Sequence, residues 1–324
     1  MSGEKNLVVA LCGGIGGAKL ALGLSRVLPP DELVVVVNTG DDFEHLGFCI
    51  SPDLDTVMYT LAGEDNPETG WGRRGETWSF MAALGELGGN TWFRLGDRDL
   101  ATHVARTRRL RAGEALSAIT ADLCRRLGIG VTVLPMSDDI VRTRVRSDAG
   151  WLDFQDYFVR RRAAPAVREL AFAGAAVARA QPQLLDALRS TRLRAVLICP
   201  SNPFISIDPI LAVPAIRSAL AACAAPVVAV APIIGGRAVK GPTAKMMGEL
   251  GLEPSAPAVA RHYGDLLDGY VLDEADAAAA PELAPLHVTI APTLMTSLAD
   301  RERLARVTLE TADAIRRGAK RSSG

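Results

Sequence analysis

The stretch Leu7-Val8-Val9-Ala10-Leu11-Cys12-Gly13-Gly14-Ile15-Gly16-Gly17-Ala18-Lys19 joins an apolar run to a glycine-rich loop. The apolar run predicts a strand over 7–11, and the residues after the loop predict a helix over 18–28, which Pro29-Pro30 ends. A second apolar, β-branched run at 33–37 predicts the next strand. The three elements form a β-α-β unit, which is the building block of a parallel sheet.

The rest of the chain continues this alternation. Four further apolar runs, at 195–199, 226–231, 269–273 and 287–290, predict strands, and helical patterns cover 210–222, 243–250 and 299–317. We expect an α/β fold with a doubly wound, mostly parallel, Rossmann-like sheet covered on both faces. Core strands are predicted in 1–58 and 166–324, with a helix-rich insertion or cap over about 59–165. No low-complexity linker is present, so a single packed unit is expected over 1–324.

Composition excludes several classes of protein. The net charge is −1, and no apolar run approaches the roughly 20 residues of a membrane span. The short polar start has no signal-peptide pattern, so we expect a soluble, cytoplasmic protein without a nucleic-acid or membrane partner. Five scattered cysteines read as buried thiols. Arginine runs at 106–111 and 160–162 are typical of solvated helix faces and only weakly indicate an anionic ligand.

The glycine loop is placed where backbone N–H groups and the helix dipole can receive a phosphate. It matches neither standard fingerprint. Counted from Gly14, Lys19 stands where the dinucleotide motif needs its last glycine, and Ala18 breaks the P-loop pattern. The alternative is a tight turn for strand–helix packing. The predicted nucleotide or diphosphate contacts are Gly13, Gly14, Gly16, Gly17 and Lys19.

Acidic residues follow the second strand and begin the next helix. Asp41 and Asp42 stand at the carboxyl edge of the sheet, where open α/β sheets bind ligands. Ser51-Pro52-Asp53-Leu54-Asp55 predicts a helix start; the helix dipole accounts for Asp53, whereas Asp55 is a functional candidate. Carboxylates near a phosphate loop are what Mg²⁺ prefers. The predicted catalytic residues are Asp41, Asp42 and Asp55, with Asp41 and Asp55 as metal ligands.

Two later loops also follow strands. Pro200-Ser201-Asn202-Pro203 offers a hydroxyl and an amide to a polar ligand, although a proline-bounded turn explains it equally well. The loop 232–245 is a second glycine-rich, basic segment that contains Gly235 and Gly236. Two such loops suit a diphosphate better than a monophosphate. No nucleophile elbow is visible, so covalent catalysis is not expected.

Six segments together, in order from residue 7 to about 297, resemble the 2-phospho-L-lactate transferase family of coenzyme F-420 biosynthesis. They are 13–19, 38–42, 51–59, 95–99, 200–203 and 232–236. The resemblance implies transfer of phospholactate, phosphoenolpyruvate or 3-phosphoglycerate from a guanosine diphosphate-linked donor to the deazaflavin alcohol Fo. It also implies release of GMP, use of Mg²⁺ and a homodimer. The sequence leaves open which phospho-acid is transferred.

The same resemblance implies roles for particular residues. Asp55 would lie at the Fo and metal site, and Arg94, where some relatives have lysine, would contact Fo. The glycine loop, Ser201, Asn202, Gly235 and Gly236 would hold the guanosine diphosphate. The terminal ribityl hydroxyl of Fo would attack the phosphorus nearer the organic acid in line with the leaving GMP. Mg²⁺ on Asp41 or Asp42 and Asp55 would offset charge, with help from Lys19 or Arg98.

Two other classes are alternatives. A regulator of the gluconeogenesis-factor type would share the fold and the glycine loop and bind a nucleotide-linked ligand without catalysis. The segment 95–99 and Trp92 favour the transferase, and binding of Fo distinguishes the two classes. An NAD-dependent dehydrogenase is disfavoured by the broken dinucleotide fingerprint.

Overall fold

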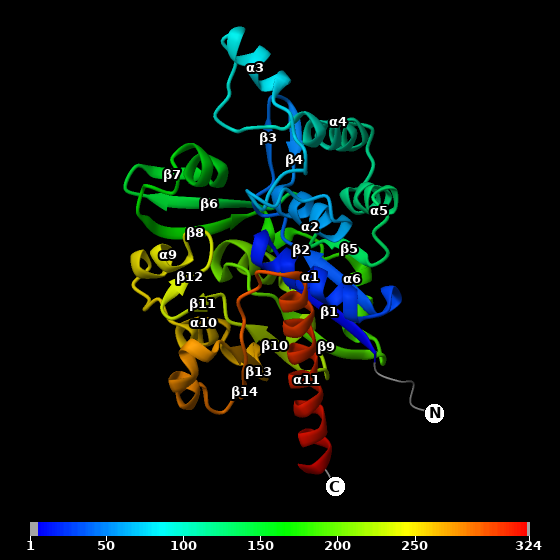
Figure 1. Cartoon of the computed structure of the whole chain (residues 1–324), viewed down its shortest axis with the longest axis vertical. Coiled ribbons are helices and arrows are strands. Elements are labelled where there is room, and N and C mark those ends of the chain that lie inside the picture. Colours follow the sequence, from blue (N-terminus) through cyan, green and yellow to red (C-terminus); the bar gives the residue numbers. More distant parts are fainter. Residues whose placement is uncertain (1–5, 323–324) are drawn as a thin grey trace.

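A computed structural model describes residues 6–322, with side chains through 318. Its centre is a seven-stranded sheet in the order β14-β13-β10-β9-β1-β2-β5 (Figure 1). All neighbouring strands are parallel, which confirms the predicted α/β class with a parallel sheet. The strands are β1 (Leu7–Cys12), β2 (Leu33–Val37), β5 (Thr132–Pro135), β9 (Leu193–Ile198), β10 (Val227–Val230), β13 (Gly269–Leu272) and β14 (His287–Ile290).

Helices bury both faces of this sheet. In β1, Val8 and Ala10 pack on one face and Val9 and Leu11 on the other, as the alternation of side chains along a strand requires. All four are fully buried, which explains why the strand reads as a continuous apolar run. The first face is covered by α1 (Gly14–Val27), α2 (Pro52–Ala62), α5 (Leu116–Arg126) and α11 (Leu298–Ser322). The second is covered by α6 (Pro182–Arg189), α8 (Pro214–Ala221) and α10 (Ala256–Tyr263).

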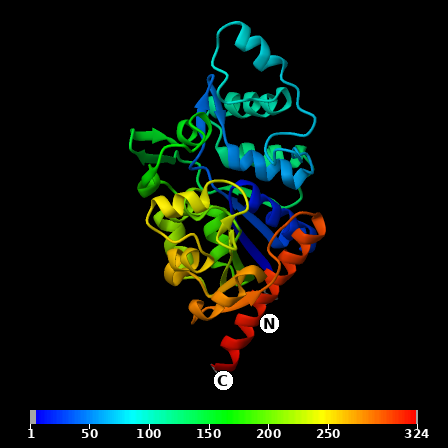
Figure 2. The same ribbon diagram turned by 60° about the vertical axis from the view of Figure 1, so that its left-hand side comes forward.

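Smaller elements stand over the carboxyl edge of the sheet. Figures 1 and 2 show α3 at one end of the long axis and the end of α11 at the other. An antiparallel sheet, β7-β6-β8, lies beside this edge. The remaining elements are β3 (Phe43–His45), β4 (Phe48–Ile50), α3 (Ser79–Glu86), α4 (Asp97–Arg111), β6 (Arg142–Ser147), β7 (Gly150–Asp153), β8 (Val167–Ala173), α7 (Asp208–Leu211), β11 (Ile233–Ile234), β12 (Arg237–Ala238) and α9 (Thr243–Glu249). Short 3-10 helices and π-helical turns, among them Asp156–Arg160 and Pro203–Ile207, complete the chain.

The structure corrects the predicted division of the chain. Residues 59–165 do contain α3, α4 and α5, but they also supply β5, the edge strand of the central sheet. The antiparallel sheet starts inside this range and ends at Ala173, past the expected boundary at 166. The strand was missed because it has only four residues and includes Pro135, so its pattern is weak until it pairs with β2.

One predicted helix is divided in two. The pattern over 210–222 is occupied by α7 and α8, and Pro214 takes the first position of α8. Proline has no N–H to donate and favours this position, so the chain stops and restarts there. Within the described residues, no single helix has the length and apolar character of a membrane span, and one bent pair, Pro203–Leu211 with Pro214–Ala221, passes only when the two are combined.

The strand order brings the loops of interest to one place. The chain winds from β1 outward through β2 on one side and from β9 outward through β10 on the other. In such sheets the ligand crevice lies outside the carboxyl ends of the two strands where the order reverses, here β1 and β9. Gly13 follows β1 and Pro200 follows β9, so the two loops predicted to bind a nucleotide are neighbours.

Candidate functional site

A cavity of about 690 Å³ opens at this carboxyl edge. Loops after β1, β2, β9 and β12 line it, together with residues of α2, α4 and the segment after β7. This volume is typical of small-molecule sites. Of the predicted residues, those that line the cavity are Gly13, Gly14, Gly16, Lys19, Asp41, Asp55, Arg94, Ser201 and Asn202. The others, Gly17, Asp42, Gly235 and Gly236, are not among its lining residues.

The glycine loop combines the two alternatives raised by the sequence. Gly13 is the N-cap of α1, and Gly13, Gly14 and Gly16 face the cavity. A Cβ on Gly16 would overlap the carbonyl oxygen of Pro200, and one on Gly17 would lie 2.5 Å from Ser201 Oγ. Close packing of the loops after β1 and β9 therefore requires glycine, and the same loop also forms a wall of the site.

Replacing Gly16 with alanine should therefore push these two loops apart. We expect a destabilisation of about 2 kcal/mol, because backbone atoms cannot yield to the added methyl group. The matched control is Gly248→Ala in α9, where the added Cβ meets nothing within 4 Å. That control should keep or slightly raise stability. Thermal unfolding measures the change in stability, and equal stability of both variants would contradict the packing role.

Asp53 and Ser201 hold the glycine loop in place. The Asp53 carboxylate accepts hydrogen bonds from Gly14 N at 2.7 Å and from Asn38 Nδ2 at 3.0 Å. Ser201 Oγ accepts from Gly13 N at 3.1 Å and donates to Gly13 O at 2.9 Å. Burial raises the pKa of Asp53 to about 6. Asp53 thus does more than the helix-dipole role expected of it, and the Ser201 hydroxyl is engaged by the loop itself.

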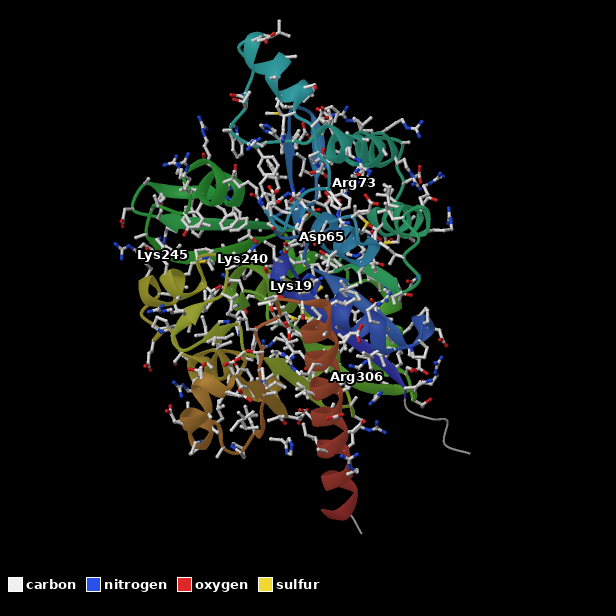
Figure 3. All side chains as sticks on the ribbon, viewed as in Figure 1. Lys19, Asp65, Arg73, Lys240, Lys245 and Arg306 are labelled. Atoms are coloured by element: carbon white, nitrogen blue, oxygen red, sulfur yellow. The ribbon has the colours of Figure 1, made fainter. Side chains whose placement is uncertain are left out.

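Two lysines bring positive charge to the glycine loop. Lys19 Nζ donates to the carbonyl oxygen of Met295 at 2.9 Å, and Lys240 Nζ donates to Thr69 O at 3.4 Å. Burial, with Arg301 and Lys240 nearby, lowers the pKa of Lys19. Figure 3 shows Lys19 and Lys240 in neighbouring positions, and both line the cavity. Two lysines in one wall are a feature typical of sites that bind anions.

The second glycine-rich loop meets the cavity beyond its glycines. Gly235 and Gly236 have φ values of 55° and 72° and make the tight turn between β11 and β12. Such a hairpin turn needs positive φ, which glycine adopts without strain. The cavity is lined by the next residues, Val239 to Thr243, including Lys240.

The acidic residues after β2 crowd one another. Asp41 Oδ1 accepts from Asn38 Nδ2 at 2.8 Å, and Asp42 Oδ2 accepts from Ser51 Oγ at 2.7 Å. Burial and the charges of Asp53 and Asp42 raise the pKa of Asp41 well above its usual range. Burial raises the pKa of Asp42 to about 7, and its Oδ1 atom has no hydrogen-bond partner in the described structure. Such crowding is costly without a cation and is what a divalent ion relieves.

Replacing Asp42 with asparagine should stabilise the metal-free protein at pH 8. The pKa of Asp42 is higher in the folded protein than in the unfolded chain, so protonation of Asp42 favours the folded state. This contribution to the free energy of unfolding is fully present below about pH 4 and is lost as the pH rises through about 7. An amide escapes this loss, and we expect a gain of about 1 to 3 kcal/mol at pH 8 and little at pH 4. Chemical unfolding at both pH values in metal-free buffer tests this. A gain that does not depend on pH would show another cause.

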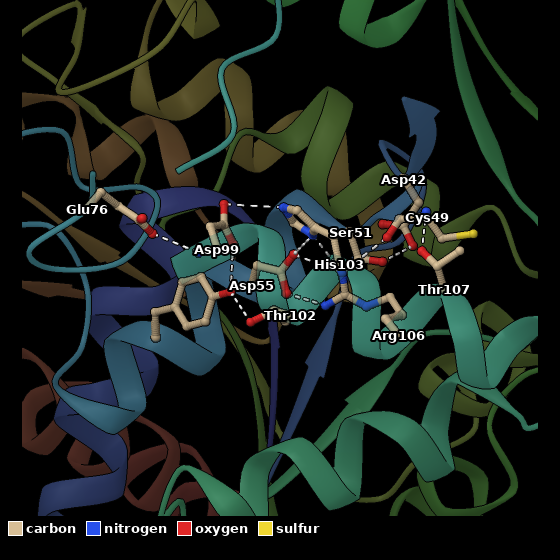
Figure 4. A network of polar contacts seen from close by, with 11 residues as sticks. Asp42, Cys49, Ser51, Asp55, Glu76, Asp99, Thr102, His103, Arg106 and Thr107 are labelled. Atoms are coloured by element: carbon tan, nitrogen blue, oxygen red, sulfur yellow. Dashed lines mark hydrogen bonds and ion pairs between the residues drawn. The ribbon is translucent and has the colours of Figure 1, made fainter. Parts of the chain in front are cut away.

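Asp55 lies at the centre of a buried polar network (Figure 4). Both of its oxygens accept from the guanidinium of Arg106, and both side chains are almost fully buried. His103 Nδ1 lies 3.6 Å from Asp55 Oδ2, and His103 Nε2 lies 3.3 Å from Asp99 Oδ2. Asp99 accepts a hydrogen bond of 2.6 Å from Tyr59 Oη. Asp55 is therefore held rigidly, with one edge of its network open to the cavity at Asp99 and His103.

Sequence reasoning missed the contribution of α4. Asp99, His103 and Arg106 are four and three residues apart, so they share one face of this helix. That spacing could have predicted a polar face on this helix, although it could not show that the face packs on Asp55. Donor atoms of Asp55, Asp99 and His103 lie within 4.8 Å of one another, so this group could hold a metal ion. Arg98, on the same helix, instead donates to Arg74 O and is not a lining residue.

Together the fold and the cavity define a doubly wound α/β protein with its small-molecule site at the switch point of the sheet. The chain belongs to the family described as 2-phospho-L-lactate transferase CofD, whose pattern matches residues 8–289. The resemblance read from the six segments is confirmed, and the chain is a transferase enzyme.

Similar proteins agree with this assignment. A protein named phosphoenolpyruvate transferase from Kitasatospora aureofaciens is 47% identical over 320 residues, covering 96% of this chain and 99% of the relative. One of the same name from Streptomyces coelicolor is 43% identical, covering 95% of this chain and 99% of its own. A crystal structure of a UPF0052 family member from Bacillus halodurans matches with a TM-score of 0.61 at 13% identity, covering 94% of this chain and 99% of that one. This last likeness shows the fold alone.

Proposed function

We propose that this chain transfers a phospho-acyl group from a guanosine diphosphate-linked donor to the deazaflavin Fo, releasing GMP, in coenzyme F-420 biosynthesis. The observation that carries the proposal is one cavity in which the glycine loop and two lysines adjoin crowded carboxylates. Phosphoenolpyruvate is the favoured acid, because relatives that are 47% and 43% identical carry the name phosphoenolpyruvate transferase.

The donor's diphosphate fits the lysine-bearing part of the cavity. Gly13, Gly14 and Gly16 allow close approach, and Lys19 and Lys240 supply positive charge. Asn202 Oδ1 accepts from Phe204 N at 3.0 Å, which leaves its amide nitrogen for a ligand apart from a 3.7 Å contact with Met246. Ser201 serves this site by fixing Gly13, and Gly235 and Gly236 by shaping the loop that carries Lys240.

Mg²⁺ fits the carboxylates beside that part. Asp41 and Asp55, which both line the cavity, would hold it, and the raised pKa of Asp41 is the feature expected of a carboxylate that lacks its cation. When bound, the ion offsets the charge of the diphosphate. The group formed by Asp55, Asp99 and His103 is a second candidate, and its histidine suits a transition metal better than Mg²⁺.

The acceptor fits the side of the cavity lined by aromatic residues. Trp92 and Phe93 line it, and the Arg94 guanidinium lies 4.0 Å above the ring centre of Trp78. A flat deazaflavin ring can stack on such side chains, and Arg94 can contact it from the same wall. The Asp55 carboxylate, held by Arg106, lies in the cavity wall where the ribityl hydroxyl would give up its proton.

The reaction is then an in-line displacement. The terminal ribityl oxygen of Fo forms a bond to the phosphorus nearer the organic acid. The bond from that phosphorus to the bridging oxygen breaks, and GMP leaves with its electrons. Lys19 and Lys240 would stabilise the charge that develops on the leaving phosphate.

The deciding experiment supplies Fo with each donor in turn. Donors in which the β-phosphate of guanosine diphosphate carries enolpyruvate, lactate or glycerate are incubated with enzyme, and products are identified by mass. We expect the phosphoenolpyruvate product and GMP to form fastest, with at least a hundredfold loss after removal of divalent metal and recovery with Mg²⁺. If no donor reacts and Fo fluorescence is unchanged by the protein, a non-catalytic nucleotide-binding regulator becomes the better explanation.

A further inference from the structure

Three consecutive arginines, Arg160 to Arg162, begin at the last residue of the π-helical turn Asp156–Arg160, beside the cavity. Arg160 and Arg161 both pair with Asp156, at 3.6 Å and 2.8 Å. Arg162 makes no ion pair or side-chain hydrogen bond within the described residues, yet it lines the cavity. One acidic residue thus accounts for two of the three charges and leaves the third facing the site.

The backbone separates Arg162 from its two neighbours. Arg162 and Ala163 have φ values of 53° and 51°, a left-handed conformation that non-glycine residues rarely adopt. Backbone hydrogen bonds hold this turn, from Ala163 N to Tyr157 O at 2.9 Å and from Arg162 N to Val159 O at 3.3 Å. Strain of this kind occurs most often at ligand-binding and active sites, where the surrounding structure maintains it.

The segment that carries Arg162 is tied to the acidic residues and to the second basic loop. Gln155 Nε2 donates to Asp41 O at 3.1 Å, and Lys245 Nζ donates to Pro165 O at 3.2 Å. Lys245 belongs to α9, whose first residue, Thr243, also lines the cavity. The wall with Arg162 therefore borders the region where the donor's phosphate would meet the metal-binding carboxylates.

Other cations of the cavity have partners within the protein. Lys19 is bound to Met295 O, Lys240 to Thr69 O, and Arg94 lies over Trp78. Among the described residues that line the cavity, Arg162 is the cationic side chain for which no hydrogen bond, ion pair or aromatic contact is found. A guanidinium presents two parallel N–H groups that match a carboxylate, which a lysine cannot reproduce.

We propose that Arg162 binds the carboxylate of the donor's organic acid and so selects donors that carry an acid group. This inference rests on the proposed function, because it assumes a guanosine diphosphate-linked acid as donor. It assigns Arg162 to substrate specificity, while the diphosphate stays with the glycine loop and the lysines.

The test compares Arg162→Gln and Arg162→Lys with the matched control Arg161→Gln, which removes the same charge one residue away. Donor affinity is measured by calorimetry without Fo, and KM and kcat by turnover with it. Two donors are used: guanosine diphosphate with enolpyruvate on its β-phosphate, and the carboxamide analogue of that donor. For the acid donor we expect Arg162→Gln to weaken affinity and raise KM by 10- to 100-fold, with KM for Fo within twofold. Arg162→Lys should fall between, and Arg161→Gln should match the wild type.

The carboxamide donor gives the decisive readout. If Arg162 reads the carboxylate, wild type and Arg162→Gln bind this analogue equally. An equal loss on both donors would show that Arg162 contacts phosphate or supports the wall, and no loss on either would show that it contacts neither; both results overturn the inference. Calorimetry keeps the test separate from the proposed function: absent turnover by the wild type counts against the reaction, whereas unchanged donor affinity in Arg162→Gln counts against Arg162.

Discussion

Asp55→Asn should lower kcat about a thousandfold. The Asp55 carboxylate lies in the cavity wall and is oriented by Arg106. No other carboxylate of α2 takes part in the same polar network, so none can replace it. Loss of one preorganised charged group at a phosphoryl-transfer site costs about 10² to 10³ in rate, and loss of a metal ligand adds to this. Steady-state turnover of Fo across a range of Mg²⁺ concentrations measures the effect, and we expect the half-saturating Mg²⁺ concentration to rise at least tenfold.

The control for this variant is Asp148→Asn. Asp148 forms an exposed pair with Arg168 on the antiparallel sheet, away from the cavity-lining residues. It should retain wild-type kcat and Mg²⁺ dependence. Normal turnover of Asp55→Asn at limiting Mg²⁺ would rule out the metal role. Circular dichroism at the assay temperature checks that the variant is folded, because Arg106 loses its charged partner.

Arg106→Met should destabilise the protein by about 3 to 5 kcal/mol. The substitution fills a similar volume but leaves the Asp55 carboxylate, which is 4% exposed, buried without its cation. Breaking a buried ion pair from one side has this cost because the remaining charge stays desolvated. Denaturant unfolding measures the free energy, and Arg125→Met, whose side chain is 73% exposed in its pair with Asp122, should change it by less than about 1 kcal/mol.

The double variant Asp55→Asn/Arg106→Met separates pairing from packing. If the cost arises from an uncompensated charge, the double variant should be more stable than Arg106→Met alone, and the coupling energy should exceed about 2 kcal/mol. Additive losses would instead mean that Arg106 contributes chiefly by filling space between α4 and α2. Turnover by the double variant should remain as low as that of Asp55→Asn, since the Asp55 carboxylate is absent in both.

Local sequence patterns were sufficient to predict most strands of the sheet and the glycine loop. The strand β14 was predicted with the bounds 287–290 that it has, and the two strands of the first β-α-β unit were predicted to within one residue, whereas its helix begins at Gly14 and not at residue 18. A strand buried on both faces is apolar at every position, so its pattern is visible without knowledge of its neighbours. The same reasoning failed for β5, whose four residues acquire their place in the sheet only through pairing with β2.

The arginine run 106–111 shows where local reasoning ends. It was expected to be a solvated helix face, and Arg108 and Arg111 are exposed, but Arg106 is among the largest fully buried side chains. Nothing in the run itself distinguishes Arg106. Its burial follows from the packing of α4 over Asp55, a partner 51 positions away in the chain.

By itself the sequence determined the parallel α/β core, the glycine loop after β1, the acidic segments after β2 and the family. Each depends on residue types within one or two turns of chain, where side-chain period and backbone freedom are local properties. Only the tertiary structure decided which residues of each motif line the cavity and which hold other residues in place. In the folded chain, Asp53 and Ser201 form hydrogen bonds to the glycine loop, and Asp55 pairs with Arg106 and His103. The cavity is lined by Lys240 and not by the predicted Gly235 and Gly236. These outcomes depend on burial and on the distances between charges that long-range packing brings together.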